Sequence, residues 1–216
     1  MPNENRIIEQ TNILDRLDSI EWGVADVNLP GQTESGDQFI VKPFNDGALI
    51  GVVDGLGHGD QAAAAARLTT ATLGAHAHES VTSLIKRCHN ELIGTRGVVM
   101  SLASIRPREE KMIWCAVGNV EAVLIRADSQ SIPFREYLLM RGGVVGIKLP
   151  PLHASVMPIA PGDTLIFATD GISQGYMSDQ SLHESPQKLA HTICSKYSKG
   201  TDDALVLVVR YTGIGK

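Results

Sequence analysis

The sequence has few cysteines, and their spacing excludes the usual cysteine-based sites. The 216 residues contain three, Cys88, Cys115 and Cys194. They are odd in number and too widely separated for a disulfide framework or a zinc site of paired cysteines. Each lies in an apolar pattern, which predicts buried free thiols in a reducing cytoplasm.

The sequence also lacks the features of several partners and locations. The formal net charge is -5, and no basic stripe with interleaved aromatics is present, so we predict no nucleic-acid partner. No apolar run approaches the length of a membrane-spanning helix, and the first ten residues contain no apolar signal core. We therefore predict a cytoplasmic protein with no membrane partner.

The composition indicates one globular domain. Hydrophobic residues make up 43% of the chain and charged residues 20%, values typical of a protein with one sizeable core. No linker or internal repeat divides the sequence. We predict a single domain over residues 1–216, in which residues 1–19 form an N-terminal extension with a short helix at residues 5–18.

The order of the predicted elements indicates an α+β fold. Apolar periodicity predicts helices at residues 60–78, 80–93 and 186–198. Strand-like runs cover residues 20–29, 38–44, 48–54, 97–106, 111–118, 121–127, 135–140, 164–170 and 204–211. Because the strands arrive in consecutive groups and do not alternate with helices, we predict two largely antiparallel sheets covered by helices. The fully apolar run 204–211 predicts a strand that is buried on both faces.

Four acidic motifs each lie at the beginning or end of an apolar strand. They are Gly36-Asp37, Asp54-Gly55, Asp170-Gly171 and Asp202-Asp203. A single Asp-Gly pair is most simply a turn. If the strands converge, however, the carboxylates share one cleft and repel one another unless cations neutralise them. Oxygen ligands without histidine or cysteine favour Mg²⁺ or Mn²⁺, and a pair of such ions suits phosphoryl chemistry.

No motif supplies a nucleophilic side chain. The sequence has no GxSxG element and no cysteine with a suggestive neighbour. The glycines at positions 55, 57 and 59 are an alternative candidate for a nucleotide loop. Neither the Gly-Lys-Ser/Thr of a P-loop nor a GxGxxG pattern follows, which argues against that alternative.

The motifs and their order resemble the PPM-type serine/threonine protein phosphatases, in particular their SpoIIE-like branch. The resemblance covers residues 20–211. It is carried by the acidic motifs, by DGLGHG at residues 54–59 and by Gly118-Asn119 and Thr169-Asp170-Gly171. Within the branch, the segments IKRCHNELIGTRGVVMSLASI, WCAVGNVEAVLI and DDALVLV resemble the short single-domain phosphatases of stressosomes.

The resemblance implies a fold, a reaction and a partner. The fold would be a four-layer α/β/β/α sandwich. The reaction would be Mn²⁺- or Mg²⁺-dependent dephosphorylation of phosphoserine or phosphothreonine, by direct attack of a metal-bound hydroxide. The substrates would be STAS-domain scaffold proteins of a stressosome, which makes the chain a negative regulator of a general stress response. A non-catalytic module that binds a STAS-domain partner on the same fold is the alternative.

The resemblance also implies site roles. Asp54 would bridge two cations and act with the metal-bound water. Asp37 and the carbonyl of Gly55 would hold one cation, and the other would be held by Asp170 and Asp202. Asp203 is a second choice as a ligand.

Some positions depart from the family pattern or have two interpretations. Residues 28–36 contain no arginine or lysine, although eukaryotic relatives bind phosphate through an arginine in this region. Leu205 replaces a common threonine, a change that we expect to be structural. His58 is either a proton donor that also orients water or a helix-start histidine bonded to the backbone. We interpret Gly118-Asn119 as a turn. Arg67, Lys86, Arg87 and Arg96 are either substrate contacts or residues of solvated helix faces, and we favour the second interpretation.

Overall fold

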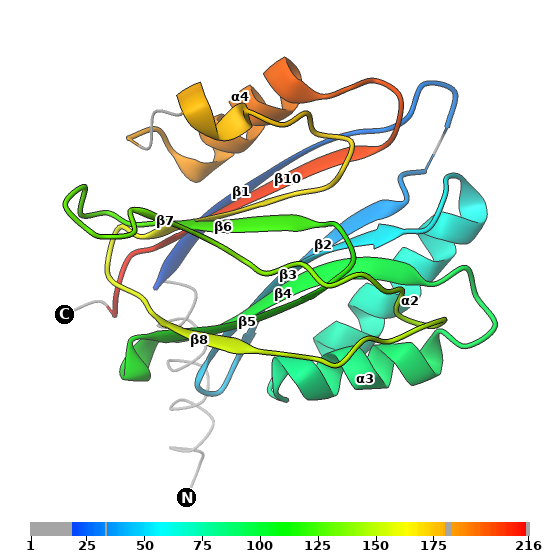
Figure 1. Cartoon of the computed structure of the whole chain (residues 1–216), viewed down its shortest axis with the longest axis horizontal. Helices are drawn as coiled ribbons and strands as arrows, with labels where there is room; N and C mark the ends of the chain where they lie inside the picture. The colour runs from blue at the N-terminus through cyan, green and yellow to red at the C-terminus, as the bar shows by residue number, and fades with distance from the viewer. Residues whose placement is uncertain (1–18, 33, 180–182, 215–216) are drawn as a thin grey trace, which may run out of the picture.

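The computed structural model describes residues 19–32, 34–179 and 183–214 and shows two five-stranded sheets packed face to face (Figure 1). The predicted helix at residues 5–18 lies outside the described residues. The single domain over residues 1–216 therefore stays a prediction.

All strand pairs within the two sheets are antiparallel. The first sheet has the order β1 (Ile20–Val27), β10 (Ala204–Tyr211), β9 (Thr164–Ala168), β6 (Glu121–Ile125) and β7 (Arg135–Tyr137). The second sheet has the order β2 (Asp37–Phe44), β3 (Gly47–Gly55), β4 (Val98–Arg106), β5 (Lys111–Val117) and β8 (Ser155–Pro158).

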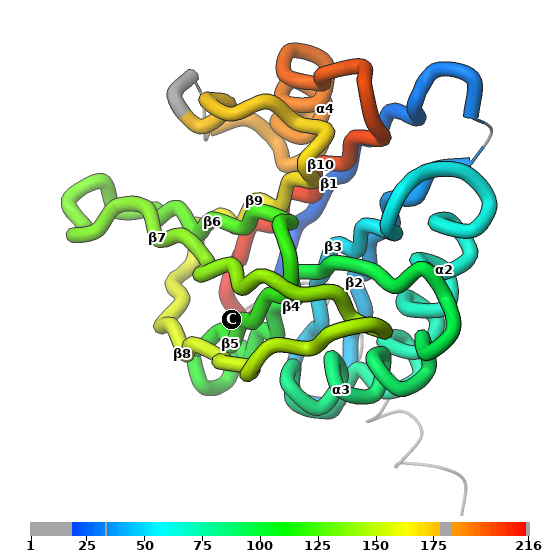
Figure 2. Tube along the Cα trace, turned by 45° about the vertical axis from the view of Figure 1, so that its right-hand side comes forward, coloured from blue at the N-terminus to red at the C-terminus, as the bar shows by residue number. Residues whose placement is uncertain are grey.

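Helices cover the outer face of each sheet. The helix α4 (Pro186–Tyr197) packs on β1 and β10, while α2 (Asp60–Ala75) packs on β2 and β3, beside α3 (Val81–Glu91) (Figure 2). Two short 3₁₀ helices, η1 (Pro107–Glu109) and η2 (Tyr176–Asp179), lie in connections. The predicted four-layer α/β/β/α sandwich is confirmed. Among the described residues, no helix is long and apolar enough to cross a membrane.

The helix starts follow from local chemistry. Ser80 caps α3, because its hydroxyl accepts a hydrogen bond from the Ser83 N–H at 3.2 Å. The helix α2 begins after Gly59, which offers no side-chain cap. Asp60 lies in the first turn, where a carboxylate interacts favourably with the helix dipole.

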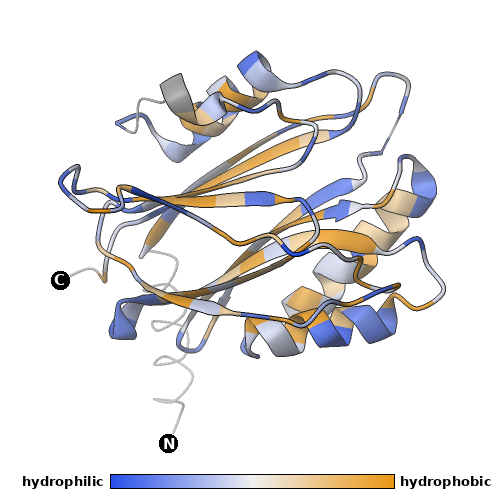
Figure 3. Ribbon diagram, in the orientation of Figure 1, coloured by the Kyte–Doolittle hydropathy of each residue, from blue (hydrophilic) through white to orange (hydrophobic). Residues whose placement is uncertain are grey.

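The strand β10 is buried on both faces, as the apolar run predicts. Its odd-numbered residues, such as Leu205 and Leu207, belong to the apolar layer between the sheets. Its even-numbered residues, such as Val206 and Val208, pack with the buried residues of α4. Figure 3 shows the apolar residues gathered along the strands and the hydrophilic ones on the outer surface of the helices. The three cysteines are buried and free.

Some predicted boundaries were wrong. The strand β7 ends at Tyr137 and β9 ends at Ala168, so Asp170 lies in a loop and not in the strand. The strand β8 was missed because it is short and largely exposed, and so carries no burial pattern. It pairs with β5 alone, at the edge of its sheet.

The layer between the sheets should dominate the stability of the fold. We expect Leu207→Ala to lower the free energy of unfolding by about 2–5 kcal/mol, because Leu207 is fully buried in this layer and its truncation leaves a cavity. The control Leu139→Ala removes the same atoms from a side chain that is 64% exposed, and should cost less than about 0.5 kcal/mol. Urea denaturation of the two variants measures the difference. Equal losses would contradict the assignment of the core.

Candidate metal centre

The first two acidic residues face each other across a hairpin. The strands β2 and β3 pair so that Asp37, at the start of one, lies opposite Asp54, near the end of the other. Side chains of directly opposed residues lie on the same face of a sheet and within reach of each other. Asp37 is buried and Asp54 is half-buried. The hairpin that the sequence predicts thus brings two of the four motifs together.

The other acidic residues come from the opposite sheet. Asp170 follows the end of β9, and Asp202 and Asp203 precede the start of β10. Because β9 and β10 are antiparallel neighbours, this end and this start lie side by side. Across the sandwich, β10 contacts β2 and β9 contacts β3. All four motifs therefore meet at one end of the space between the sheets.

The electrostatics of the cluster favour a bound cation. Burial raises the pKa of Asp54 to about 8, and the charges of Asp37, Asp170, Asp202 and Asp203 add to this. Burial also raises the pKa of Asp37 to about 7, against a hydrogen bond from Thr169 that lowers it. Removing these carboxylates from water beside one another costs free energy that a divalent cation would offset.

The donor set suits a hard divalent ion, since carboxylate and carbonyl oxygens are the ligands that Mg²⁺ and Mn²⁺ prefer. Within residues 19–32, 34–179 and 183–214, however, no three acidic, histidine or cysteine side chains are already arranged around one point to hold a metal ion. The carboxylates are close enough for their charges to raise the pKa values of Asp37 and Asp54, but they do not form a closed site. The assignment of individual ligands therefore stays a prediction.

Thr169 is a site residue that sequence reasoning missed. Its hydroxyl donates a hydrogen bond to Asp37 Oδ2 at 2.7 Å and accepts one from the Leu205 N–H at 2.9 Å. It thereby ties the two sheets together at the acidic cluster, where it is only 2% exposed. The available signal was its place directly before Asp170, at the end of an apolar strand. Leu205, in turn, lies in the core between the sheets, as the structural role expected for it requires.

Asp203 anchors the segment that leads into β2. Its two carboxylate oxygens accept hydrogen bonds from the backbone N–H groups of Leu29 and Gly36, each at 2.7 Å. The side chain is buried. This structural role explains an aspartate at position 203, and its use as a metal ligand stays a prediction. Asp202 Oδ1 accepts the N–H of Asp203 at 2.9 Å.

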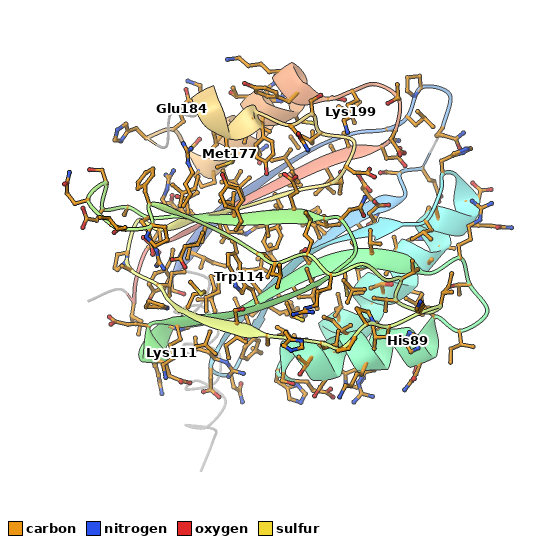
Figure 4. The ribbon with its side chains drawn as sticks, viewed as in Figure 1. His89, Lys111, Trp114, Met177, Glu184 and Lys199 are labelled. Carbon is orange, nitrogen blue, oxygen red and sulfur yellow. The ribbon has the colours of Figure 1, made fainter. Side chains whose placement is uncertain are left out.

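Two contacts hold the exposed Asp170. Asn119 donates a hydrogen bond from Nδ2 to Asp170 Oδ2 at 2.8 Å. Gly118-Asn119 forms the predicted turn, which connects β5 in one sheet to β6 in the other. The Asn119 side chain therefore reaches the acidic cluster. Lys199, labelled in Figure 4, donates from Nζ to the backbone oxygen of Asp170.

The glycine loop lies tightly against α2. A Cβ at Gly55 would lie 2.3 Å from the Ala62 carbonyl oxygen, so only glycine permits this close approach beside Asp54. His58 is exposed, and no residue in the described part of the chain hydrogen-bonds its ring. The backbone-bonded interpretation of His58 is therefore not observed, and its role as a proton donor stays a prediction.

Comparison with known proteins identifies the family. The model of the family described as stage II sporulation protein E matches residues 45–212. The chain belongs to the SpoIIE family. The phosphoserine phosphatase RsbX of Bacillus subtilis (strain 168) is 27% identical over 154 residues, which are 71% of this chain and 75% of RsbX.

Two solved structures extend this result. A solved structure described as "The bacterial stressosome: a modular system that has been adapted to control secondary messenger signaling" has a TM-score of 0.80 and 27% identity, and the match covers 88% of this chain and 99% of that chain. A crystal structure of RsbX in complex with magnesium has a TM-score of 0.80 and 23% identity, and the match covers 89% of this chain and 96% of the RsbX chain. With the family assignment, these matches identify the SpoIIE-family chain as a PPM-type protein phosphatase.

The raised pKa values predict how stability depends on pH without metal. The folded state keeps protons on Asp37 and Asp54 that the unfolded chain releases near pH 4, so their contribution to stability is full below that pH. It is lost as the pH rises through about 7 and 8. We expect metal-free wild type to lose more stability between pH 5 and 8.5 than Asp54→Asn does, as measured by urea denaturation. Parallel pH profiles would contradict this.

Thr169 should matter through its hydroxyl. We expect Thr169→Val to lower the free energy of unfolding by about 1–3 kcal/mol, because the Asp37 carboxylate and the Leu205 N–H would each lose a buried partner. Thr169→Ser keeps the hydroxyl and serves as the matched control. Chemical denaturation of both variants tests the prediction, and equal stabilities would count against it.

Proposed function

We propose that the chain is a Mn²⁺- or Mg²⁺-dependent phosphatase of phosphoserine or phosphothreonine in STAS-domain scaffold proteins of a stressosome. The main support is the convergence of the acidic motifs, Asp37 and Asp54 from one sheet with Asp170 and Asp202 from the other. The likeness to RsbX and to a stressosome structure supports the choice of partner. In this role the chain would oppose a general stress response. The cytoplasmic location stays a prediction.

The proposed ligands come from both sheets. Asp54 would lie between two cations, of which one is also held by Asp37 and the Gly55 carbonyl and the other by Asp170 and Asp202. When bound, the cations would activate water for attack on phosphorus and neutralise the phosphate oxygens. Asp203 is retained as the second-choice ligand.

The neighbouring residues prepare these positions. The Thr169 hydroxyl orients Asp37, and the Asn119 amide orients Asp170. Fixed polar groups of this kind need little rearrangement when charge develops in a reaction.

The departing serine or threonine oxygen needs a proton. We propose His58 as the donor, because its exposed imidazole belongs to the same loop as Gly55.

The proposal predicts which carboxylates are essential. Asp54→Asn and Asp170→Asn should each abolish phosphate release from a phosphorylated STAS-domain protein, and EDTA should abolish it in the wild type, because each change removes part of the metal centre. Asp46→Asn, in the turn at the far end of β3, is the matched control and should keep full activity. Thermal unfolding should show that all variants are folded.

Two outcomes would contradict the proposal. One is phosphate release that persists in EDTA or in either centre variant. The other is tight binding of the phosphorylated STAS protein by metal-free chain with no turnover when metal is restored. The second outcome would favour the non-catalytic binding module.

A further inference from the structure

The proposed cations would neutralise part of the substrate's charge, but segment 28–36 has no arginine or lysine that could bind the phosphoryl group directly. A phosphorylated serine carries close to two negative charges at neutral pH. It must approach a site in which the protein's own groups are carboxylates. Arginine is well suited to bind such a group, because its planar guanidinium donates two parallel hydrogen bonds to phosphate oxygens.

Three cationic side chains contact the segments that carry the acidic motifs. Arg67 pairs with Glu34, and Lys199 donates to the backbone oxygen of Asp170. Arg96 is the third, and no carboxylate in the described ranges of the chain pairs with it. Lys199 also has no carboxylate partner in these ranges, but its ammonium already donates to a backbone oxygen. Arg96 offers the forked guanidinium that suits a phosphoryl group.

The strand register places Arg96 beside the centre. The pairing of β3 with β4 sets Asp54 opposite Val99 and Gly55 opposite Val98. It continues beyond the strands, where the Leu56 N–H donates to the Gly97 carbonyl at 3.1 Å. Arg96 is thus level with Gly57, three residues beyond Asp54. Because the chain bends after β3 ends at Gly55, the two positions are at most about 10 Å apart, the length of three fully extended residues. The long arginine side chain and a phosphoryl group can span this distance together.

The guanidinium is held in place on the glycine loop. Arg96 Nε donates a hydrogen bond to Gln61 Oε1, in the first turn of α2, at 2.8 Å. Its Nη1 lies against Gly57, where a Cβ would come within 2.7 Å of it. Gly57 has a φ of +83°, so both its backbone conformation and the guanidinium favour glycine here. The bond to Gln61 uses only Nε, and the two terminal NH₂ groups keep donors for a ligand.

There is also room beside Arg96. A surface hollow of about 470 Å³ separates α2 from the loop before β4. Its lining includes Gln61, Leu68 and Arg96, and Leu68 is 38% exposed. An anion, or the residues next to a phosphorylated serine, can therefore approach the guanidinium without moving the backbone.

We propose that Arg96, oriented by Gln61, binds the phosphoryl oxygens of the substrate, an inference that rests on the proposed phosphatase function. Arg96 would be a substrate-binding residue, and Gln61 a positioning residue that acts through it. This assignment takes up the substrate-contact alternative for Arg96 and not the solvated position that the sequence favours.

The test compares Arg96→Gln, Arg96→Lys and the control Arg108→Gln. Arg108 lies beyond the other end of β4, so Arg108→Gln removes the same charge far from the centre. With saturating Mn²⁺, kcat and KM are measured on p-nitrophenyl phosphate and on a phosphorylated STAS protein, together with the inhibition constant of inorganic phosphate. Thermal unfolding reports whether each variant is folded.

We expect Arg96→Gln to raise the inhibition constant of inorganic phosphate, and KM for both substrates, by about tenfold or more, since a charge-assisted bidentate contact is lost. Arg96→Lys should show a smaller increase, because it keeps the charge but not the fork geometry. Arg108→Gln should match the wild type.

Three results would overturn the inference. One is an unchanged phosphate inhibition constant in Arg96→Gln. Another is a rise in KM for the phosphoprotein alone, which would mean that Arg96 contacts the partner and not the phosphoryl group. The third is a melting temperature of Arg96→Gln so low that unfolding accounts for the whole loss of phosphate and substrate binding. If the wild type itself releases no phosphate, the proposed function fails, which is a separate outcome from these three.

Discussion

The packing of two sheets through one apolar layer is the constraint on which the rest of this structure depends. The layer includes Leu205 and Leu207 from one sheet and Trp114 from the other. Because these side chains interlock, the end of β9 and the start of β10 are held over the ends of β2 and β3. A shift of either sheet would separate the carboxylates that it carries from those of its partner.

The acidic centre is accordingly a site of opposed forces. Hydrophobic packing brings Asp37 and Asp54 together with three further carboxylates, and burial together with their mutual repulsion raises the pKa values of the two. The surrounding hydrogen bonds offset part of this cost, most directly the Thr169 hydroxyl on Asp37. The stable core holds the carboxylates together against their repulsion. A cation that binds there removes the repulsion and so stabilises the folded state.

Much of the fold followed from local patterns. The apolar runs predicted most strands, and helical periodicity predicted α2, α3 and α4, because each of these elements buries one face or both. The strand β8 escaped this reasoning, since it is largely exposed and pairs only at a sheet edge. Thr169 and Asn119 were not predicted as site residues, for another reason. Neither residue type is distinctive alone, and their partners, Asp37 and Asp170, are 132 and 51 positions away in the chain.

The sequence by itself determined most of the elements and the positions of the four acidic motifs near strand ends, because both depend on neighbours within a few residues. The pairing of Asp37 with Asp54 also follows from it, since a hairpin of fixed register leaves little choice. Only the tertiary structure decided that Asp170 and Asp202 join this pair, that Asp203 anchors a loop, and that Arg96 lies over Gly57. These contacts cross between elements or between sheets, and their geometry is set by how the core packs.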